Sequence, residues 1–130
     1  MPKNIIKALT VTFLGLALFS PKVAVASVAA TAEEILTLQK SPNANHLILD
    51  VRTPGEYAEG HIRGALLIPM RDIPGKLNLL GKDKLIIVVC ATGARSGAVT
   101  DYLANNGYSA VKNYRGGMSD WARKGLPIEK

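Results

Sequence analysis

KLIIVVCATGARSG, residues 84–97, is the stretch of the chain that decides the fold. Its first six residues show no alternation of polar and apolar side chains, and such a run predicts a strand that is buried on both faces. The residues after this run are small, and they lead into residues 95–106, where we expect a helix. A buried strand that passes directly into a helix is the unit from which parallel sheets are built.

The rest of the chain repeats this alternation of strand and helix. In addition to residues 84–89, we expect strands at residues 46–51, 65–69 and 109–114. The capping-box pattern of Thr31 and Glu34 opens a helix that runs to about Lys40, and further helices are expected at residues 54–59, 71–80, 95–106 and 118–124. Because connections between parallel strands are right-handed crossovers, the sequence predicts an α/β fold with a central parallel sheet and helices on both faces.

The first 26 residues are expected to be an export signal and not part of the fold. Lys3 and Lys7 accompany a twelve-residue apolar run at residues 8–19, and residues 24–26 read AVA, a small-x-small cleavage pattern. The run is shorter than the roughly 20 residues that span a bilayer, so we expect no stable membrane anchor. We predict a signal peptide at residues 1–26, with cleavage after Ala26 or alternatively after Ala29, and an exported, periplasmic domain at residues 27–130.

Length and charge limit the classes of function that are open to the chain. A chain of 130 residues holds one domain, and 5% aromatic residues are too few for a platform that stacks nucleic-acid bases. Loss of Lys3, Lys7 and Lys22 with the leader reduces the 16 basic residues to 13, against 10 acidic ones, for a net charge of +3. That modest charge, without a Lys/Arg cluster, argues against a nucleic-acid partner and suits a small anionic ligand.

Cys90 is the single cysteine, which excludes an internal disulfide, a CxxC redox pair and a cysteine-rich zinc site. Its thiol is therefore either an inert core group or a reactive one. The reactive alternative is favoured because Cys90 stands at the carboxyl end of a buried strand, where parallel sheets bind ligands. Gly93 allows a positive φ, and the loop N–H groups with the start of the next helix would form an anion cradle. Such a cradle, with Arg95 beside it, lowers the pKa of a thiol.

Three blocks of the sequence resemble the rhodanese family in their order and spacing. The first block is LILDVR (residues 47–52), followed by EY (56–57) and GHIRGA (60–65). The second, CATGARS (90–96), resembles the family's Cys-x-x-Gly-x-Arg-Ser loop, and the third is YRGGM (114–118) with Trp121. The resemblance implies a single-domain rhodanese-like fold over residues 32–127. Such domains often begin with a short strand, for which only residues 27–30 remain, so we expect four or five strands.

The resemblance also implies a sulfurtransferase in which Cys90 accepts a sulfane sulfur and becomes a persulfide. The donor would be thiosulfate or a similar compound, the acceptor cyanide or a thiol, and the reaction needs no metal or organic cofactor. The persulfide-binding loop would consist of Ala91, Thr92, Gly93, Ala94, Arg95 and Ser96. The spacing Cys-x4-Arg, shorter than the Cys-x5-Arg of phosphatase relatives, favours a sulfur atom over a phosphoryl group. Two alternatives stay open: a persulfide sulfur carrier, and a non-catalytic rhodanese-like binding module.

Five polar residues outside the loop have expected roles. We expect Arg52, Glu56 and His61 to be structural, with Arg52 paired to Glu56 across the turn that separates them. Asp50 is expected at the same sheet edge as Cys90 and is a candidate for a hydrogen bond to the loop. Arg115 is a candidate for holding the charge of a dianionic donor.

Overall fold

The computed structural model describes residues 28–41 and 45–130, and within them five parallel strands form one sheet. The predicted signal peptide, residues 1–26, lies outside the described residues. The strands are β1 (Val28–Ala30), β2 (His46–Asp50), β3 (Leu66–Leu67), β4 (Leu85–Val89) and β5 (Val111–Tyr114), in the order β1-β5-β4-β2-β3. The stretch that decides the fold therefore supplies the central strand, β4, and the chain leaves the middle of the sheet at Cys90.

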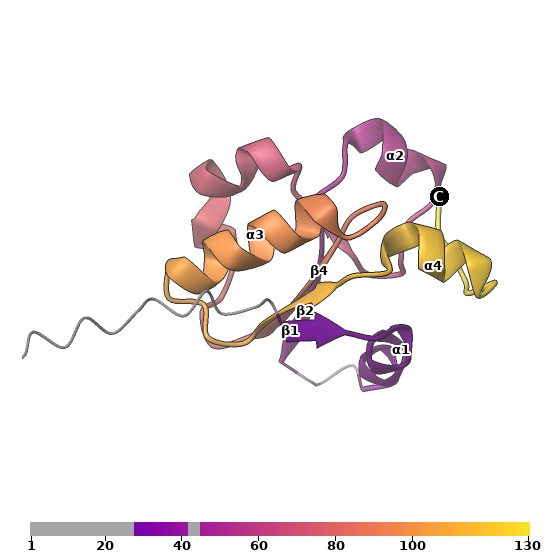
Figure 1. Ribbon diagram of the computed structural model, residues 1–130, viewed down its shortest axis with the longest axis horizontal. Coiled ribbons are helices and arrows are strands. Elements are labelled where there is room, and N and C mark those ends of the chain that lie inside the picture. The colour runs from indigo at the N-terminus through magenta and orange to yellow at the C-terminus, as the bar shows by residue number, and fades with distance from the viewer. Residues whose placement is uncertain (1–27, 42–44) are drawn as a thin grey trace, which may run out of the picture.

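Helices connect the strands and cover both faces of the sheet (Figure 1). They are α1 (Ala32–Gln39), α2 (Pro54–Glu59), the 3-10 helix η1 (Met70–Leu79), α3 (Ala94–Asn105) and α4 (Gly117–Arg123). Side chains on the two sides of a strand consequently enter two separate cores. In β4, Ile86 and Val88 pack on the side of α3 and η1, whereas Ile87 and Val89 pack on the side of α1 and α4. The predicted α/β fold, with helices on both faces, is confirmed.

The two edge strands differ in how well the sequence predicted them. β1 is present, so the sheet has five strands, and Ala30 pairs with Tyr114 of β5. β3 has two residues where we expected a strand over residues 65–69. β3 lies at the sheet edge, where Leu66 is 37% exposed, so this run is not buried on both faces as the central strand β4 is. Pro69 has no N–H to continue a ladder, in keeping with a strand that ends early.

The segment expected to be a helix at residues 71–80 is a 3-10 helix over Met70–Leu79. Pro74 lies inside it, and Lys76 has the non-helical angles φ −126° and ψ 19°. Proline removes an N–H donor and clashes with the preceding turn, so a regular α-helix is disfavoured here. Ile73 nevertheless anchors the segment, because its side chain is fully buried in the core beneath α3.

The pairing of β1 with β5 predicts a stability difference between two N-terminal truncations. A chain that begins at residue 30 lacks Val28 and Ala29, which pair with Lys112 and Asn113 of β5. We expect it to be about 1–2 kcal/mol less stable than a chain that begins at residue 27, because sheet hydrogen bonds are lost. Urea unfolding of both forms measures the difference, and equal stabilities would contradict a structural role for β1.

Candidate active site

The segment after β4 is held by backbone hydrogen bonds to the start of α4. The N–H groups of Met118 and Ser119 donate to the carbonyl oxygens of Cys90 and Ala91, at 2.9 and 3.0 Å. Because these carbonyls face α4, the N–H groups of the residues that follow can face the sulfur of Cys90. The N–H of Gly93 donates to Cys90 Sγ at 3.1 Å. The expected cradle of backbone donors therefore forms around the sulfur.

Two glycines allow the loop and the segment after β5 to approach this closely. Gly93 has a φ of +93°, and a Cβ added there would lie 2.2 Å from the carbonyl oxygen of Arg115. Gly117 has a φ of +61°, and a Cβ added there would lie 2.5 Å from the carbonyl oxygen of Ala91. Residues other than glycine rarely adopt such φ angles, and neither position has room for a side chain. The second and third blocks of the family-like pattern, residues 90–96 and 114–118, thus together shape the loop after Cys90.

The sulfur of Cys90 is almost completely buried, with 1% of the residue exposed. Burial on its own raises the pKa of the thiol, since it disfavours the charged form. Hydrogen bonds that the thiolate form accepts from the Ser96 hydroxyl and from the backbone N–H groups of Ser96, Thr92 and Gly93 outweigh burial, and the pKa is lowered overall. The N-terminus of α3, which begins at Ala94, adds a favourable dipole beside the thiolate. The loop can therefore hold a thiolate out of contact with water.

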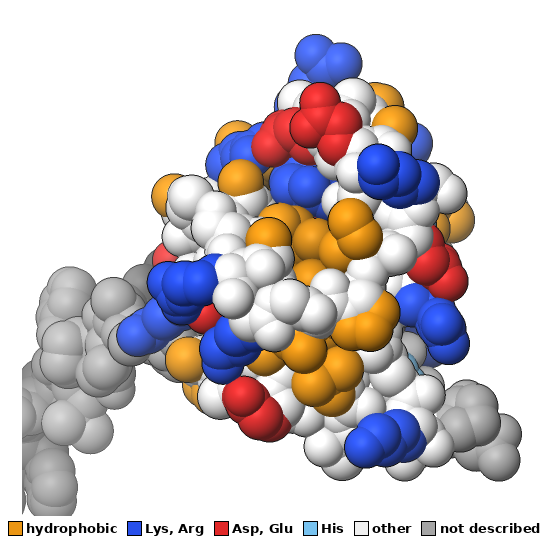
Figure 2. All heavy atoms as spheres, turned by 90° about the vertical axis from the view of Figure 1, so that its right-hand side faces the viewer, with side chains coloured by type: hydrophobic (Ala, Val, Ile, Leu, Met, Phe, Trp, Pro, Cys, Tyr) orange, Lys and Arg blue, Asp and Glu red, His pale blue; other side chains and the backbone are white. Residues whose placement is uncertain are grey.

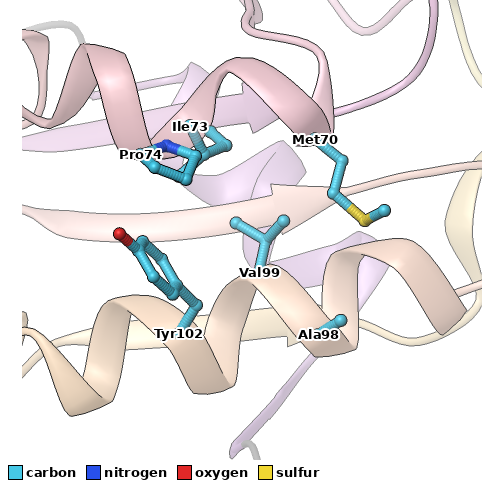
Figure 3. Close-up of a pocket in the computed structure, with 6 residues that line it drawn as sticks. All are labelled: Met70, Ile73, Pro74, Ala98, Val99 and Tyr102. Atoms are coloured by element: carbon cyan, nitrogen blue, oxygen red, sulfur yellow. The ribbon is translucent and has the colours of Figure 1, made fainter.

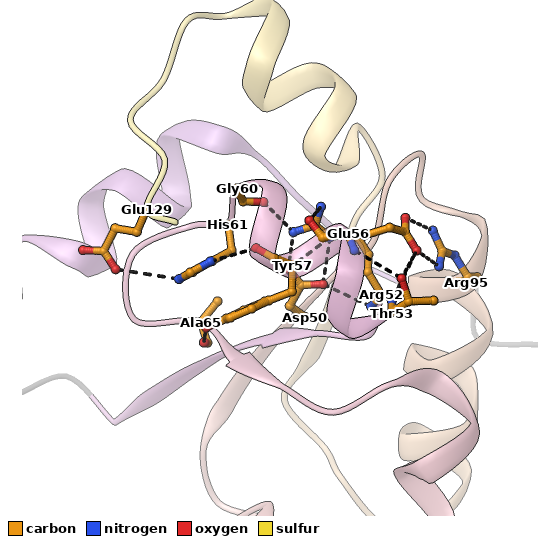
Figure 4. Close-up of polar contacts among 10 residues, drawn as sticks. All are labelled: Asp50, Arg52, Thr53, Glu56, Tyr57, Gly60, His61, Ala65, Arg95 and Glu129. Carbon is orange, nitrogen blue, oxygen red and sulfur yellow. Dashed lines mark hydrogen bonds and ion pairs between the residues drawn. The ribbon is translucent and has the colours of Figure 1, made fainter.

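The guanidinium of Arg95 forms a bidentate ion pair with the carboxylate of Glu56 in α2 (Figure 4). Both oxygens of the carboxylate accept from the guanidinium at 2.8 Å. Glu56 Oε1 also accepts from the N–H and the hydroxyl of Thr53, at 3.2 and 3.1 Å, as part of the α2 capping box. The Arg95 hydrogen bonds chiefly account for a Glu56 pKa lowered to about 2. The ion pair joins the loop to α2, and it offsets much of the charge expected from Arg95.

The expected pairing of Arg52 with the Glu56 carboxylate is wrong, because Arg52 pairs with Asp50 (Figure 4). Arg52 Nη2 lies 2.7 Å from Asp50 Oδ2, and Asp50 Oδ1 accepts from the Arg52 N–H. Arg52 reaches Glu56 only at its backbone carbonyl, and it also donates to the backbone carbonyl of Gly60. The carboxylate of Asp50 accepts from Arg52 and not from the loop after Cys90. Both buried side chains thus fix the chain between β2 and the end of α2.

His61 lies on the far side of α2 from the sulfur-bearing loop. Its ring stacks on Tyr57 with 3.7 Å between ring centroids, and its Nδ1 lies 3.1 Å from the carbonyl oxygen of Tyr57. Its backbone bridges to Glu129 near the C-terminus. These contacts join the segment after α2 to the end of the chain, and none of them involves the loop.

The outer surface of the loop is exposed to solvent. Thr92 and Ala94 are exposed, Ala91 is half-buried, and Arg115 is exposed at the end of β5. Arg115 reaches the site through its backbone, since its carbonyl oxygen packs on Gly93. The structure thereby brings Cys90 and its loop to the edge where β4 and β5 end, as the sequence predicts for a parallel sheet.

Sequence reasoning missed Asn113, a buried residue of β5 that contacts the loop from below. Its Oδ1 accepts from the Ser96 hydroxyl at 2.6 Å, and its Nδ2 donates to the carbonyl oxygen of Gly93 at 3.1 Å. The residue is only 4% exposed. An amide that interrupts a buried strand is a usable signal, because buried polar side chains need partners.

Two hollows lie on the side of η1, and Arg95 of the loop lines one of them. The larger, about 280 Å³, is lined by Arg52, Pro54, Met70 and Arg95 with their neighbours. The smaller, about 180 Å³, has apolar walls formed by η1 and α3 (Figure 3): Met70, Ile73, Pro74, Ala98, Val99 and Tyr102. Figure 2, which faces the carboxyl ends of the strands, shows hydrophobic side chains grouped on this face with Lys and Arg around them. Cys90 lines neither of these two hollows.

Two kinds of feature are absent from the described residues, 28–41 and 45–130. No group of three or more His, Cys, Asp and Glu side chains in these ranges could hold a metal ion. No helix in the same ranges has the length and apolar character needed to cross a bilayer.

Comparisons with known proteins agree with this geometry. The rhodanese-like domain family matches residues 31–124. The chain is similar to a sulfurtransferase of Allochromatium vinosum, with 42% identity over 95 residues, 73% of this chain and 89% of the relative. It is also similar to thiosulfate sulfurtransferase 16 of Arabidopsis thaliana, a chloroplastic protein, with 39% identity over 66% of this chain and 82% of the relative. A rhodanese-like domain protein of Staphylococcus aureus superposes with a TM-score of 0.67 at 40% identity, covering 79% and 99% of the two chains.

The close approach of Gly93 to Arg115 predicts the effect of adding one methyl group. Gly93→Ala would require a positive φ and would place Cβ against the Arg115 carbonyl oxygen, so we expect a loss of stability of at least about 1–3 kcal/mol. Alkylation of Cys90 should slow as well, since the N–H of residue 93 would move from the sulfur. Gly75→Ala is the matched control, because no heavy atom lies within 4 Å of that position. Equal unfolding midpoints for the two variants would contradict the packing argument.

The ion pair between Glu56 and Arg95 predicts a pH-dependent contribution to stability. The Glu56 pKa falls on folding from an ordinary value near 4.5 to about 2. Its ionised form therefore stabilises the fold above about pH 5, and this contribution is lost as the pH falls toward 2. We expect Glu56→Gln to cost about 1 kcal/mol at neutral pH, a figure that allows for solvent screening of a carboxylate about one-third exposed.

Urea unfolding of the wild type and of Glu56→Gln between neutral pH and acid measures this difference. The two stabilities should converge as the pH approaches 2. Glu59→Gln, which changes an exposed carboxylate of the same helix, is the matched control and should lie within about 0.5 kcal/mol of the wild type. A difference between wild type and Glu56→Gln that does not change with pH would contradict the ion-pair explanation.

Proposed function

The chain belongs to the rhodanese-like domain family, and on that basis we propose that it transfers a sulfane sulfur through a persulfide on Cys90. The donor is thiosulfate or a similar sulfane compound, and the acceptor is cyanide or a thiol. Relatives named as sulfurtransferases support rhodanese-type sulfur transfer as the general activity. The observation that carries the proposal is the buried sulfur of Cys90, which accepts hydrogen bonds from backbone N–H groups of its loop. These bonds lower the pKa of the thiol.

The first half-reaction forms the persulfide. The Cys90 thiolate attacks the outer sulfur of thiosulfate, a new S–S bond forms to Cys90 Sγ, and the old S–S bond breaks. The bonding electron pair leaves with sulfite, so no external oxidant or reductant is needed. The same loop N–H groups that favour the thiolate are placed to hold the negative charge of the outer sulfur.

The second half-reaction returns the thiolate. Cyanide or an acceptor thiolate attacks the outer sulfur of the persulfide, and the electron pair of the breaking bond returns to Cys90 Sγ. The products are thiocyanate or the persulfide of the acceptor. The two half-reactions give ping-pong kinetics, the usual mark of covalent catalysis. Arg95, which is paired with Glu56, acts in this scheme mainly by fixing the loop against α2.

Export of the domain remains part of the proposal, with residues 1–26 as its signal. Cleavage after Ala26 would leave β1 complete, whereas cleavage after Ala29 would remove two of its three residues. Because Val28 and Ala29 pair with Lys112 and Asn113 of β5, the first site is the better match to the fold. The periplasm is the destination that this leader suggests.

Sulfur loading of the purified protein tests the proposed reaction. After treatment with thiosulfate and removal of the donor, intact-mass spectrometry should show the gain of one sulfur atom on the wild type and none on Cys90→Ser. Addition of cyanide should remove the sulfur and release thiocyanate. Sulfur that loads but passes only to a protein thiol would identify a sulfur carrier. No loading from any sulfane donor would overturn the proposal and leave a binding module.

A further inference from the structure

We infer that Asn113 is a positioning residue for Cys90, because it binds the single hydroxyl proton of Ser96 and withholds it from the sulfur while Cys90 is a thiol. When the thiol ionises, the hydroxyl turns from Asn113 to the thiolate. The relevance of this exchange to sulfur transfer rests on the proposed function. The exchange itself concerns only the thiol, the hydroxyl and the amide.

The three side chains form a continuous buried chain between β4, α3 and β5. Cys90 Sγ lies 3.2 Å from Ser96 Oγ, and Ser96 Oγ lies 2.6 Å from Asn113 Oδ1. Ser96 is fully buried, Cys90 is 1% exposed and Asn113 is 4% exposed. With so little access to water, each polar atom depends on its neighbours in this chain for hydrogen bonds.

The orientation of the Asn113 amide is fixed by the carbonyl oxygen of Gly93. That oxygen accepts hydrogen bonds and cannot donate them, so the amide nitrogen must face it, at 3.1 Å. The reversed amide would place two acceptor oxygens against each other. Asn113 Oδ1 therefore faces Ser96 and can only accept, which makes Ser96 the donor of the 2.6 Å bond.

The Ser96 hydroxyl has one proton, and its allocation decides the state of the sulfur. While that proton is donated to Asn113, Ser96 Oγ can only accept from Cys90, so Cys90 donates as an S–H group. A thiolate has no proton to donate and instead requires donors. After ionisation, the thiolate and Asn113 Oδ1 therefore compete for the one hydroxyl proton of Ser96. Whichever of the two does not receive it stays buried without a hydrogen bond from Ser96. Asn113 thus opposes ionisation, while the backbone N–H groups of the loop favour it.

Charged groups on the surrounding elements act on the same equilibrium. They are the Asp50–Arg52 pair after β2, the Glu56–Arg95 pair between α2 and α3, Arg115 after β5, and Asp120 of α4, which accepts from Tyr114. None of these side chains is altered in the variants compared below. Their effects on the Cys90 pKa therefore cancel when differences between variants are taken.

A purely structural role for Asn113 makes a different prediction. If the residue only ties the loop to β5 through the Gly93 carbonyl, its removal loosens the cradle and costs the thiolate its backbone donors. The Cys90 pKa would then rise, and it would rise equally whether or not residue 96 carries a hydroxyl. The withheld-proton role predicts a fall that requires this hydroxyl. The sign and the dependence on Ser96 separate the two roles.

The test is a double-mutant cycle read out as the pKa of Cys90. Thiolate absorbance against pH is recorded for the wild type, Asn113→Ala, Ser96→Ala and the double variant. We expect Asn113→Ala to lower the pKa by about 0.5 to 1 unit when Ser96 is present, since a freed hydroxyl donates to the thiolate. In the Ser96→Ala background, Asn113→Ala should not lower the Cys90 pKa. Thr100→Val, which removes a buried hydroxyl that bonds the Ser96 carbonyl, is the matched control and should leave the pKa unchanged.

A second measurement keeps the inference testable if Asn113→Ala does not fold. The S–H stretching band of the wild type, identified by its absence from Cys90→Ser, should lie at the lower frequency of a hydrogen-bond donor and should move upward in Ser96→Ala. A band unaffected by Ser96→Ala would overturn the inference, as would an equal pKa change from Asn113→Ala in both backgrounds. Neither readout uses a sulfur donor, so failure of the proposed transfer reaction would be seen separately.

Discussion

A sulfur removed from water ionises readily only where other donors replace the water, and this constraint governs the structure around Cys90. The residue is 1% exposed, so the chain itself must supply the hydrogen bonds that a thiolate requires. Backbone N–H groups can do so only if the loop turns sharply around the sulfur, and that turn requires Gly93 at a positive φ. The position of β4 at the centre of the sheet brings this loop to the edge where ligands are accepted.

Elements distant in the sequence serve the same loop from different sides. The start of α4 binds the carbonyl groups of residues 90 and 91, and Gly117 lets it come close enough to do so. β5 supports the loop from below through Asn113, while α2 holds it from outside through Glu56. The carboxylate of Glu56 accepts from both Arg95 and Thr53, so the cap of α2 and the loop share one group. The site is consequently a property of the whole sheet edge and not of the Cys90 loop alone.

The sequence predicted what depends on local patterns and missed what depends on contacts across the fold. Apolar runs and the capping residues located the main strands and helices, and the family-like spacing located the loop. The partner of Arg52 was predicted to be Glu56, four residues away, but the carboxylate of Glu56 is taken by Arg95, 39 residues further along the chain. Asn113 was missed for the same reason, because its partners become neighbours only when β5 pairs with β4. A sequence without its fold cannot rank such partners.

The two edge strands are short, and this limits edge-to-edge association between copies of the molecule. In the described part of the chain, β1 has three residues and β3 has two. An edge strand exposes unpaired backbone groups that can add a strand from another molecule, and the risk grows with its length. The five-stranded sheet therefore offers little template for association between sheets. The strongly apolar strand β4 is paired on both sides, with β2 and β5, so its backbone is not available to a strand from another chain.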